Sequence, residues 1–134
     1  FFKMCYVENA GIAFGLLNNS GEIIKLLLTS FRIVAVVVMF VYVYLSYKKH
    51  KFSVLFLFVF SLLISGATGN SIDSVFYDFI GLNIGAQGVL FHGKVIDMFS
   101  FSFFPPVFNL ADSYITLGCF LVLVFYKKLS ISLV

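Results

Sequence analysis

Three long apolar runs of the chain restrict its fold to one that can lie in a lipid bilayer. The runs cover residues 26–47, 52–69 and 107–126, and the second run contains no charged residue. A helix needs about 20 residues to cross the roughly 30 Å hydrocarbon core, so each run is close to one span. The composition agrees, because 61% of the residues are hydrophobic and 11% are charged, with a mean hydropathy of +1.07. We therefore expect an all-α membrane protein, a transmembrane helix bundle that forms a single domain over residues 1–134.

Lysines follow two of the apolar runs and predict how the bundle is oriented. Lys48, Lys49 and Lys51 follow the first run, and Lys127 and Lys128 follow the third. The positive-inside rule assigns their side to the cytoplasm. Three spans then place the N-terminal segment outside. Because no export signal is recognisable, we expect an earlier helix to precede the chain, which gives four spans in the full protein. The net charge of +3 lies beside apolar runs, so we expect no nucleic-acid partner.

The segments between the runs are expected to lie on the extracytoplasmic side. Residues 1–25 combine aromatic and β-branched residues with glycine-containing turns, which favours short strands that form a small β-cradle. Residues 70–106 form a second extracytoplasmic segment, in which 76–94 is expected to be an amphipathic or flexible flap. The pair Pro105–Pro106 suits the beginning of the third helix, where a missing N–H group costs little.

Polar residues recur at helical spacing at the expected outer ends of the second and third runs. Gly66, Asn70 and Asp73 are spaced i, i+4, i+7, so they share one helix face. Asn109 and Asp112 begin a second polar stripe. Helix packing through small residues and capping of a helix end are ordinary explanations for such patterns.

Two aspartates, Asp97 and Asp112, are each embedded in apolar sequence near the same expected membrane face. If the fold brings them together, they can share one proton, because like charges a few ångströms apart cannot both ionise. One carboxylate then takes a proton from water while its protonated partner polarises a peptide carbonyl. This chemistry needs no metal and no other cofactor, and we expect none. His92 has no second ligand at metal spacing, and no serine lies in a G-x-S-x-G elbow.

Four separated motifs of the chain resemble one family, the lipoprotein signal peptidases (signal peptidase II). They read YVENAGIAFG at 6–15, GATGNSID at 66–73, GKVIDMF at 93–99 and FNLADSYITLG at 108–118. The resemblance implies an aspartic endopeptidase of the bacterial inner membrane. Its substrates would be prolipoproteins, cleaved just before the cysteine that carries a diacylglyceryl group. It also implies four spans, an active site at the extracytoplasmic face and membrane lipids as neighbours, and we expect a monomer.

The resemblance also implies roles for individual residues. Asp97 and Asp112 would be the catalytic aspartates, Asn109 would orient them, and Asp73 would hold the outer end of the second span. The residues corresponding to those that line the substrate groove, where the peptide antibiotic globomycin also binds in this family, are Asn9, Asn70 and Ala111.

One position departs from the family pattern. Many members carry arginine after the aspartate of the second motif, whereas this chain has Ser74. The cations considered as substitutes are Lys94 and Arg32. Arg32 lies near the beginning of the first run, where its long side chain is expected to reach the membrane interface.

Two other classes of protein are consistent with parts of the pattern. A small transport or proton-relay subunit would use intramembrane carboxylates to carry protons, and it predicts acids near the middle of the bilayer. A non-catalytic scaffold would use the polar stripe only to hold helices together. The intramembrane proteases with a G-x-G-D motif are disfavoured, because that motif does not occur in the chain.

Overall fold

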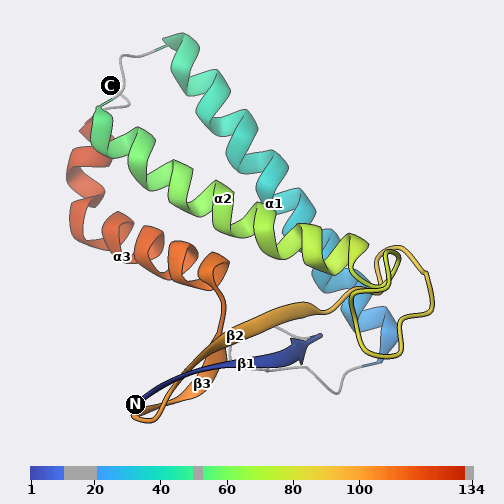
Figure 1. The fold of residues 1–134 in the computed structure, drawn as a ribbon. Helices are drawn as coiled ribbons and strands as arrows, with labels where there is room; N and C mark the ends of the chain where they lie inside the picture. The colour runs from blue at the N-terminus through green and yellow to red at the C-terminus, as the bar shows by residue number, and fades with distance from the viewer. Residues whose placement is uncertain (11–20, 50–52, 132–134) are drawn as a thin grey trace.

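Three helices and a small antiparallel sheet make up the fold in a computed structural model, which describes residues 1–10, 21–49 and 53–131 (Figure 1). In chain order the elements are β1 (Phe2–Asn9), α1 (Glu22–Lys49), α2 (Val54–Phe76), β2 (Val95–Phe101), β3 (Phe104–Phe108) and α3 (Leu110–Ile131). The aromatic start of the chain forms a strand, as predicted. The stretch 11–20, which we also assigned to the cradle, lies outside the described residues.

All three helices are long and apolar enough to cross a membrane. The qualifying segments are Glu22–Lys48, Val54–Phe76 and Leu110–Leu129. Large apolar side chains on α1 and α3 are exposed, among them Phe31 and Phe120. An exposed apolar surface of this kind is unfavourable in water and favourable against lipid. The prediction of three spans in this chain is therefore confirmed by length and composition.

The central helix of the bundle is α2, which packs against both α1 and α3 (Figure 1). At the end far from the sheet, Phe56, Val59 and Leu129 form a buried apolar cluster, and the rings of Phe56 and Phe60 stack at 4.4 Å. The last turns of α1 and α3 lie at this same end of the bundle (Figure 1). Their lysines therefore share one end, as the sequence predicted, while the orientation in a membrane stays a prediction.

Near the sheet, α2 and α3 approach each other through small residues. A Cβ atom on Gly66 would lie 2.5 Å from the carbonyl oxygen of Ala111 and 2.8 Å from Cγ1 of Ile115. Only a residue without a side chain allows the two backbones to come this close. The packing interpretation of Gly66 is confirmed, and the contact sets the position of α3 relative to α2.

The helix boundaries differ from the predicted runs, most clearly at the start of α1 and the end of α2. α1 begins at Glu22 instead of residue 26, and α2 continues to Phe76 instead of ending at 69, so residues 70–76 are helical. Nothing in this stretch stops a helix, because Ser71 and Ser74 bond back to carbonyls four residues earlier, at 2.7 and 2.8 Å. Such back-bonding keeps the hydroxyls from capping the helix. Asn70 and Asp73 consequently lie on the last turns of α2.

The expectation that Pro105–Pro106 begins the third helix is wrong, because both prolines lie in β3. The sheet has the order β1-β2-β3, which makes β3 an edge strand. Proline is tolerated on an edge strand where the missing N–H faces away from the ladder, and also at irregularities such as the register shift between Phe99 and Phe101. The recorded pairs Phe101–Phe104 and Phe99–Phe108 flank the prolines on either side. The helix begins only at Leu110.

The segment between α2 and β2 is held by side chains that form hydrogen bonds with its own backbone. The carboxylate of Asp78 accepts from Gln87 N at 3.2 Å and from Val89 N at 2.9 Å. Asn83 bonds to both the N–H and the carbonyl of Lys94, at 2.8 and 3.1 Å. The segment also contacts β1, since Lys94 Nζ lies 2.7 Å from Glu8 Oε2. The segment is thus fastened to the sheet, and none of residues 77–94 lines the cavity described below.

Candidate active site

The start of α3 provides the centre of a polar cluster. Asn109 precedes the helix and caps it, because its Oδ1 accepts from Asp112 N at 2.9 Å. Asp112 Oδ2 in turn accepts from Asn109 N at 3.3 Å. This reciprocal arrangement satisfies two N–H groups that the first turn would leave without partners. It fixes the carboxyl group of Asp112 at the end of α3 that meets the sheet.

Asp97 lies on β2 and is 3% exposed. Its Oδ2 accepts from Asn9 Nδ2 at 3.0 Å, and its Oδ1 accepts from Asn109 Nδ2 at 2.9 Å. Asn9 is the last residue of β1, and antiparallel pairing with β2 brings it beside Asp97. The sequence interpretation did not place Asp97 on a strand.

Asn70 completes the cluster from α2. Its Nδ2 donates to Asp112 Oδ1 at 2.8 Å, and its Oδ1 accepts from Asn109 Nδ2 at 3.1 Å. Asn109 therefore contacts both carboxyl groups, while each carboxyl also has a second asparagine as donor. The helices α2 and α3, the strands β1 and β2 and the residue before α3 hold these side chains in one hydrogen-bonded network.

Burial shapes the protonation of Asp97. Removal from water raises the pKa of this carboxyl above its ordinary value, and the nearby charge of Asp112 raises it further. The hydrogen bonds from Asn9 and Asn109 act in the opposite direction, but the net pKa is raised. Asp97 therefore holds a proton to a higher pH than an exposed aspartate does.

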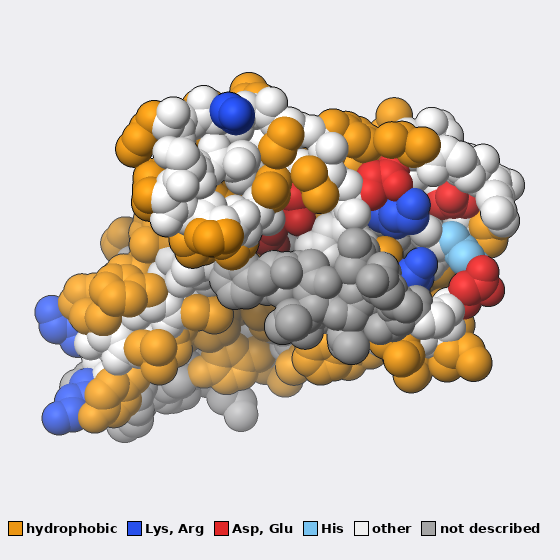
Figure 2. Space-filling view, turned by 90° about the horizontal axis from the view of Figure 1, so that it is seen from below, with side chains coloured by type: hydrophobic (Ala, Val, Ile, Leu, Met, Phe, Trp, Pro, Cys, Tyr) orange, Lys and Arg blue, Asp and Glu red, His pale blue; other side chains and the backbone are white. Residues whose placement is uncertain are grey.

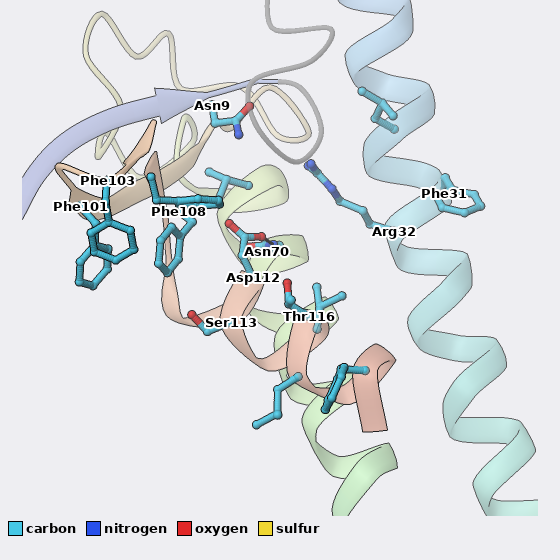
Figure 3. Close-up of a pocket in the computed structure, with 16 residues that line it drawn as sticks. Asn9, Phe31, Arg32, Asn70, Phe101, Phe103, Phe108, Asp112, Ser113 and Thr116 are labelled. Carbon is cyan, nitrogen blue, oxygen red and sulfur yellow. Dashed lines mark hydrogen bonds between the residues drawn. The ribbon is translucent and has the colours of Figure 1, made fainter. Parts of the chain in front are cut away.

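The cluster borders a cavity of about 750 Å³ (Figure 3). Asn9, Asn70 and Asp112 lie in its wall, whereas Asp97 lies behind that wall. Side chains of α1 and α3 line opposite sides of the cavity, and four phenylalanines of β2, β3 and their turn line a third. Seen from below, some acidic side chains near the centre of this face are recessed among hydrophobic ones, while others lie at the surface (Figure 2). The full set of lining residues is Asn9, Leu28, Phe31, Arg32, Asn70, Val95, Phe101, Phe103, Phe104, Phe108, Asp112, Ser113, Ile115, Thr116, Leu117 and Phe120.

Asp73 and Ala111 lie at the border of this cluster. Asp73 Oδ2 accepts from Ile96 N at 3.4 Å, so it ties the end of α2 to β2. The groove role that the resemblance implied for Ala111 stays a prediction. Its backbone oxygen faces Gly66 and its Cβ faces Gly69, so it packs between helices and is not among the residues that line the cavity.

Arg32 was expected either at the membrane interface or as a substitute for the arginine of the family pattern. Its Nη1 donates to Ser74 Oγ at 2.6 Å and its side chain lines the cavity, while its level in a membrane stays a prediction. Lys94, the other substitute considered, is bound by Glu8. The sequence signal for this position is a single arginine within an apolar span. Such a residue needs polar partners, and the aspartates expected near the same level could supply them.

The described residues contain no group of three His, Cys, Asp or Glu side chains placed to hold a metal ion. The polar groups at the described site include two carboxyl groups, three carboxamides and one guanidinium, and the hydroxyls of Ser113 and Thr116 also line the cavity.

Comparison with known proteins agrees with this architecture. The fold matches a solved bacterial membrane enzyme with a TM-score of 0.61 and 26% sequence identity, over 96% of this chain and 66% of that one. Fold and relatives together define a membrane-embedded peptidase. A family model described as signal peptidase (SPase) II matches residues 1–127. The chain belongs to the signal peptidase II family.

Curated relatives give the same result. A lipoprotein signal peptidase of Porphyromonas gingivalis is 35% identical over 158 aligned residues, which cover 96% of this chain and 68% of the relative. One from Chlorobaculum parvum is 38% identical over 133 residues, covering 96% of this chain and 74% of the relative. The chain thus spans roughly two thirds to three quarters of the length of these relatives.

Proposed function

We propose that this chain is an aspartic endopeptidase that removes the signal peptide from prolipoproteins. The curated relatives are named lipoprotein signal peptidases, and the family model covers nearly the whole chain. The observation that carries the mechanism is the contact of Asn109 with both Asp97 and Asp112. Cleavage would occur before the diacylglyceryl-modified cysteine of the substrate.

The two carboxyl groups differ in a way that suits opposite roles. Asp112 lies in the cavity wall, where a substrate and a water molecule can reach it, and it accepts from Asn70 and from the backbone of Asn109. Asp97 is buried, and its raised pKa favours the protonated form. We assign Asp112 as the general base and Asp97 as the proton-bearing partner.

The reaction then follows from this difference. Asp112 takes a proton from a water molecule, whose oxygen attacks the carbonyl carbon of the scissile peptide bond. The proton of Asp97 stabilises the oxygen that gains negative charge. The C–N bond then breaks as the leaving nitrogen receives the proton held by Asp112. One water is consumed, and one carboxylic acid and one amine are formed.

The surroundings of the carboxyl groups suit a lipid-modified substrate. The cavity joins the polar cluster to a wall of apolar side chains that continues onto the exposed faces of α1 and α3. A peptide bond can meet the aspartates while attached acyl chains remain against apolar surface. We further propose four spans in the full protein, location in the bacterial cytoplasmic membrane, and a site at its extracytoplasmic face.

A proton-relay subunit is not favoured by the position of the acids. Asp112 lies in the first turn of α3, and Asp97 lies on a strand outside the helices. Both are therefore at an end of the bundle, whereas a relay across the bilayer needs carboxyl groups along the span.

Replacement of each aspartate tests the proposal. Asp97→Asn and Asp112→Asn keep the size of the side chain and remove the acid, so each is expected to lose prolipoprotein cleavage by on the order of 10²–10⁴-fold or more. Glu22→Gln, at an exposed acid at the start of α1, is the control that loses a carboxylate elsewhere. Normal cleavage by either aspartate variant would refute the mechanism.

A further inference from the structure

A cationic side chain occupies a cavity whose walls are mostly apolar. Arg32 is half-buried on α1 and lines the cavity together with Asn70 and Asp112. Its side chain extends from α1 to the side on which Asn9, Asn70 and Asp112 lie, while the neighbouring Phe31 points away from them (Figure 3). A guanidinium within a membrane-spanning helix is costly and needs polar partners. The contacts of Arg32 therefore indicate what the guanidinium does in the cavity.

Ser74 fixes the direction of the guanidinium. Arg32 Nη1 donates to Ser74 Oγ at 2.6 Å, and Ser74, which is fully buried, donates to the carbonyl oxygen of Asn70 at 2.8 Å. Asn70 in turn donates to Asp112. The guanidinium is therefore held in a defined relation to the carboxyl group that faces the cavity.

The charges around Arg32 indicate what kind of ligand it can bind. The carboxyl groups of Asp112, Asp97 and Asp73 all lie close enough to act on Arg32 when they are ionised. An anionic ligand at this place would be repelled by these acids. A neutral acceptor, such as a carbonyl oxygen, meets no such repulsion and matches a guanidinium, which offers N–H donors in a rigid fork and no acceptor.

We propose that Arg32 is a substrate-binding residue that donates hydrogen bonds to main-chain carbonyl oxygens of the peptide in the cavity. This inference rests on the proposed function. A peptide segment that enters an apolar cavity loses the water bound to its carbonyl groups, and each lost bond is costly unless it is replaced. Arg32 replaces those bonds on the α1 side, opposite the α3 wall that carries Asp112, and so holds the scissile bond against the aspartates.

Substitution of the arginine separates binding from chemistry. Arg32→Lys keeps the charge and loses the fork, and Arg32→Gln loses the charge. Loss of a hydrogen bond to a charged group is expected to raise KM roughly 10- to 100-fold, with kcat within about threefold of the parent. Lys25→Gln is the matched control. It removes one positive charge from the same helix, at a residue that does not line the cavity.

Direct binding gives an independent readout. In an Asp97→Asn background, which is expected not to cleave, the Kd for a lipid-modified prolipoprotein peptide should rise by the same factor when Arg32→Lys is added. Ser74→Ala, which removes the anchor and leaves the arginine, should give a smaller rise. Thermal unfolding in the same detergent identifies any variant that fails to fold. If Arg32→Gln does not fold, the test uses Arg32→Lys and Ser74→Ala.

The outcomes distinguish this inference from the proposed function. Unchanged KM and Kd in folded Arg32 variants would overturn it. A loss confined to kcat, with a displaced pH profile, would also overturn it, because Arg32 would then act on the carboxyl groups alone. Cleavage by Asp97→Asn or Asp112→Asn would refute the proposed function itself. Inactive aspartate variants with normal binding in Arg32→Lys would refute only the role of Arg32.

Discussion

Asn109 donates from Nδ2 to Oδ1 of Asp97 at 2.9 Å and so joins the start of α3 to β2. The same amide caps the helix through Asp112 N, and one residue thereby performs a structural and a positioning task. The distance between the carboxyl groups thus depends on a side chain that cannot move without loosening the helix end. This coupling makes Asn109 the most sensitive non-acidic position of the cluster.

Asn109→Ser separates the two tasks. Serine caps a helix about as well as asparagine, but its shorter side chain cannot reach Asp97. We expect a fall in turnover of on the order of 10²-fold with little change in the free energy of unfolding. Asn109→Ala should lose similar activity and also about 1 kcal/mol of stability. Turnover and thermal unfolding of both variants check this, and full activity in Asn109→Ser would show that the bridge to Asp97 is dispensable.

The contact between α2 and α3 predicts unequal effects at two glycines. In Gly66→Ala, the new Cβ meets the backbone oxygen of Ala111 at 2.5 Å, which a side-chain rotation cannot relieve. In Gly69→Ala, it meets only Cβ of Ala111 at 3.3 Å. We expect Gly66→Ala to cost about 1–3 kcal/mol and to reduce activity by displacing Asp112 from Asn70, while Gly69→Ala has a smaller effect. Equal unfolding temperatures and activities for the two variants would contradict this packing.

Asp97 gives the stability a dependence on pH. Because its pKa in the folded state is raised above the ordinary value of 3.8, its contribution is complete below that value and is lost as the pH rises through the raised pKa. Asp97→Asn removes this loss. Its unfolding temperature, relative to the parent, should therefore increase from about pH 3 to about pH 7. A difference that stays constant over this range would show that burial does not perturb Asp97.

Glu8 fastens the segment 77–94 to β1 through a pH-sensitive contact. Its carboxylate accepts from Lys94 Nζ at 2.7 Å, from Tyr6 Oη at 3.0 Å and from Ile84 N. Burial alone would raise the pKa of Glu8, but these hydrogen bonds outweigh it and lower the pKa below its ordinary value of 4.5. The stabilisation by this contact is therefore fully present above about pH 4.5, and it is lost as the pH falls through the lowered pKa of Glu8.

Hydrogen exchange of residues 77–94 measures this contact. Glu8→Gln should increase exchange of the segment at neutral pH, and the parent should approach the variant as the pH is lowered, after correction for intrinsic exchange rates. Glu22→Gln, at an exposed acid of α1, should leave exchange unchanged. Identical protection in the parent and Glu8→Gln would show that other contacts, such as those of Asp78, Asn83 and Tyr6, hold the segment without Glu8.

The sequence predicted the features that depend on local pattern. Apolar length predicted the three spans, and helical spacing placed Asn70 and Asp73 on one face of α2. The resemblance brought Asp97 and Asp112 to one site, and the structure places both against Asn109. The orientation in the membrane, the fourth span and the catalytic roles stay predictions.

Other features depend on contacts between distant parts of the chain. The extended conformation at Pro105–Pro106 follows from edge pairing with β2, which local pattern cannot reveal. Arg32 is turned inward by Ser74, 42 residues away, and by acids on other elements. Ala111 packs between helices because Gly66 admits its backbone, a pairing that no single segment encodes.

The position of the cavity between α1 and α3 has a kinetic consequence. If substrate arrives sideways from the bilayer, encounters happen by diffusion in two dimensions, and the relevant concentration is the mole fraction of substrate among lipids. Adding substrate-free vesicles would then leave the rate unchanged, whereas adding detergent to mixed micelles would slow it by dilution at the surface.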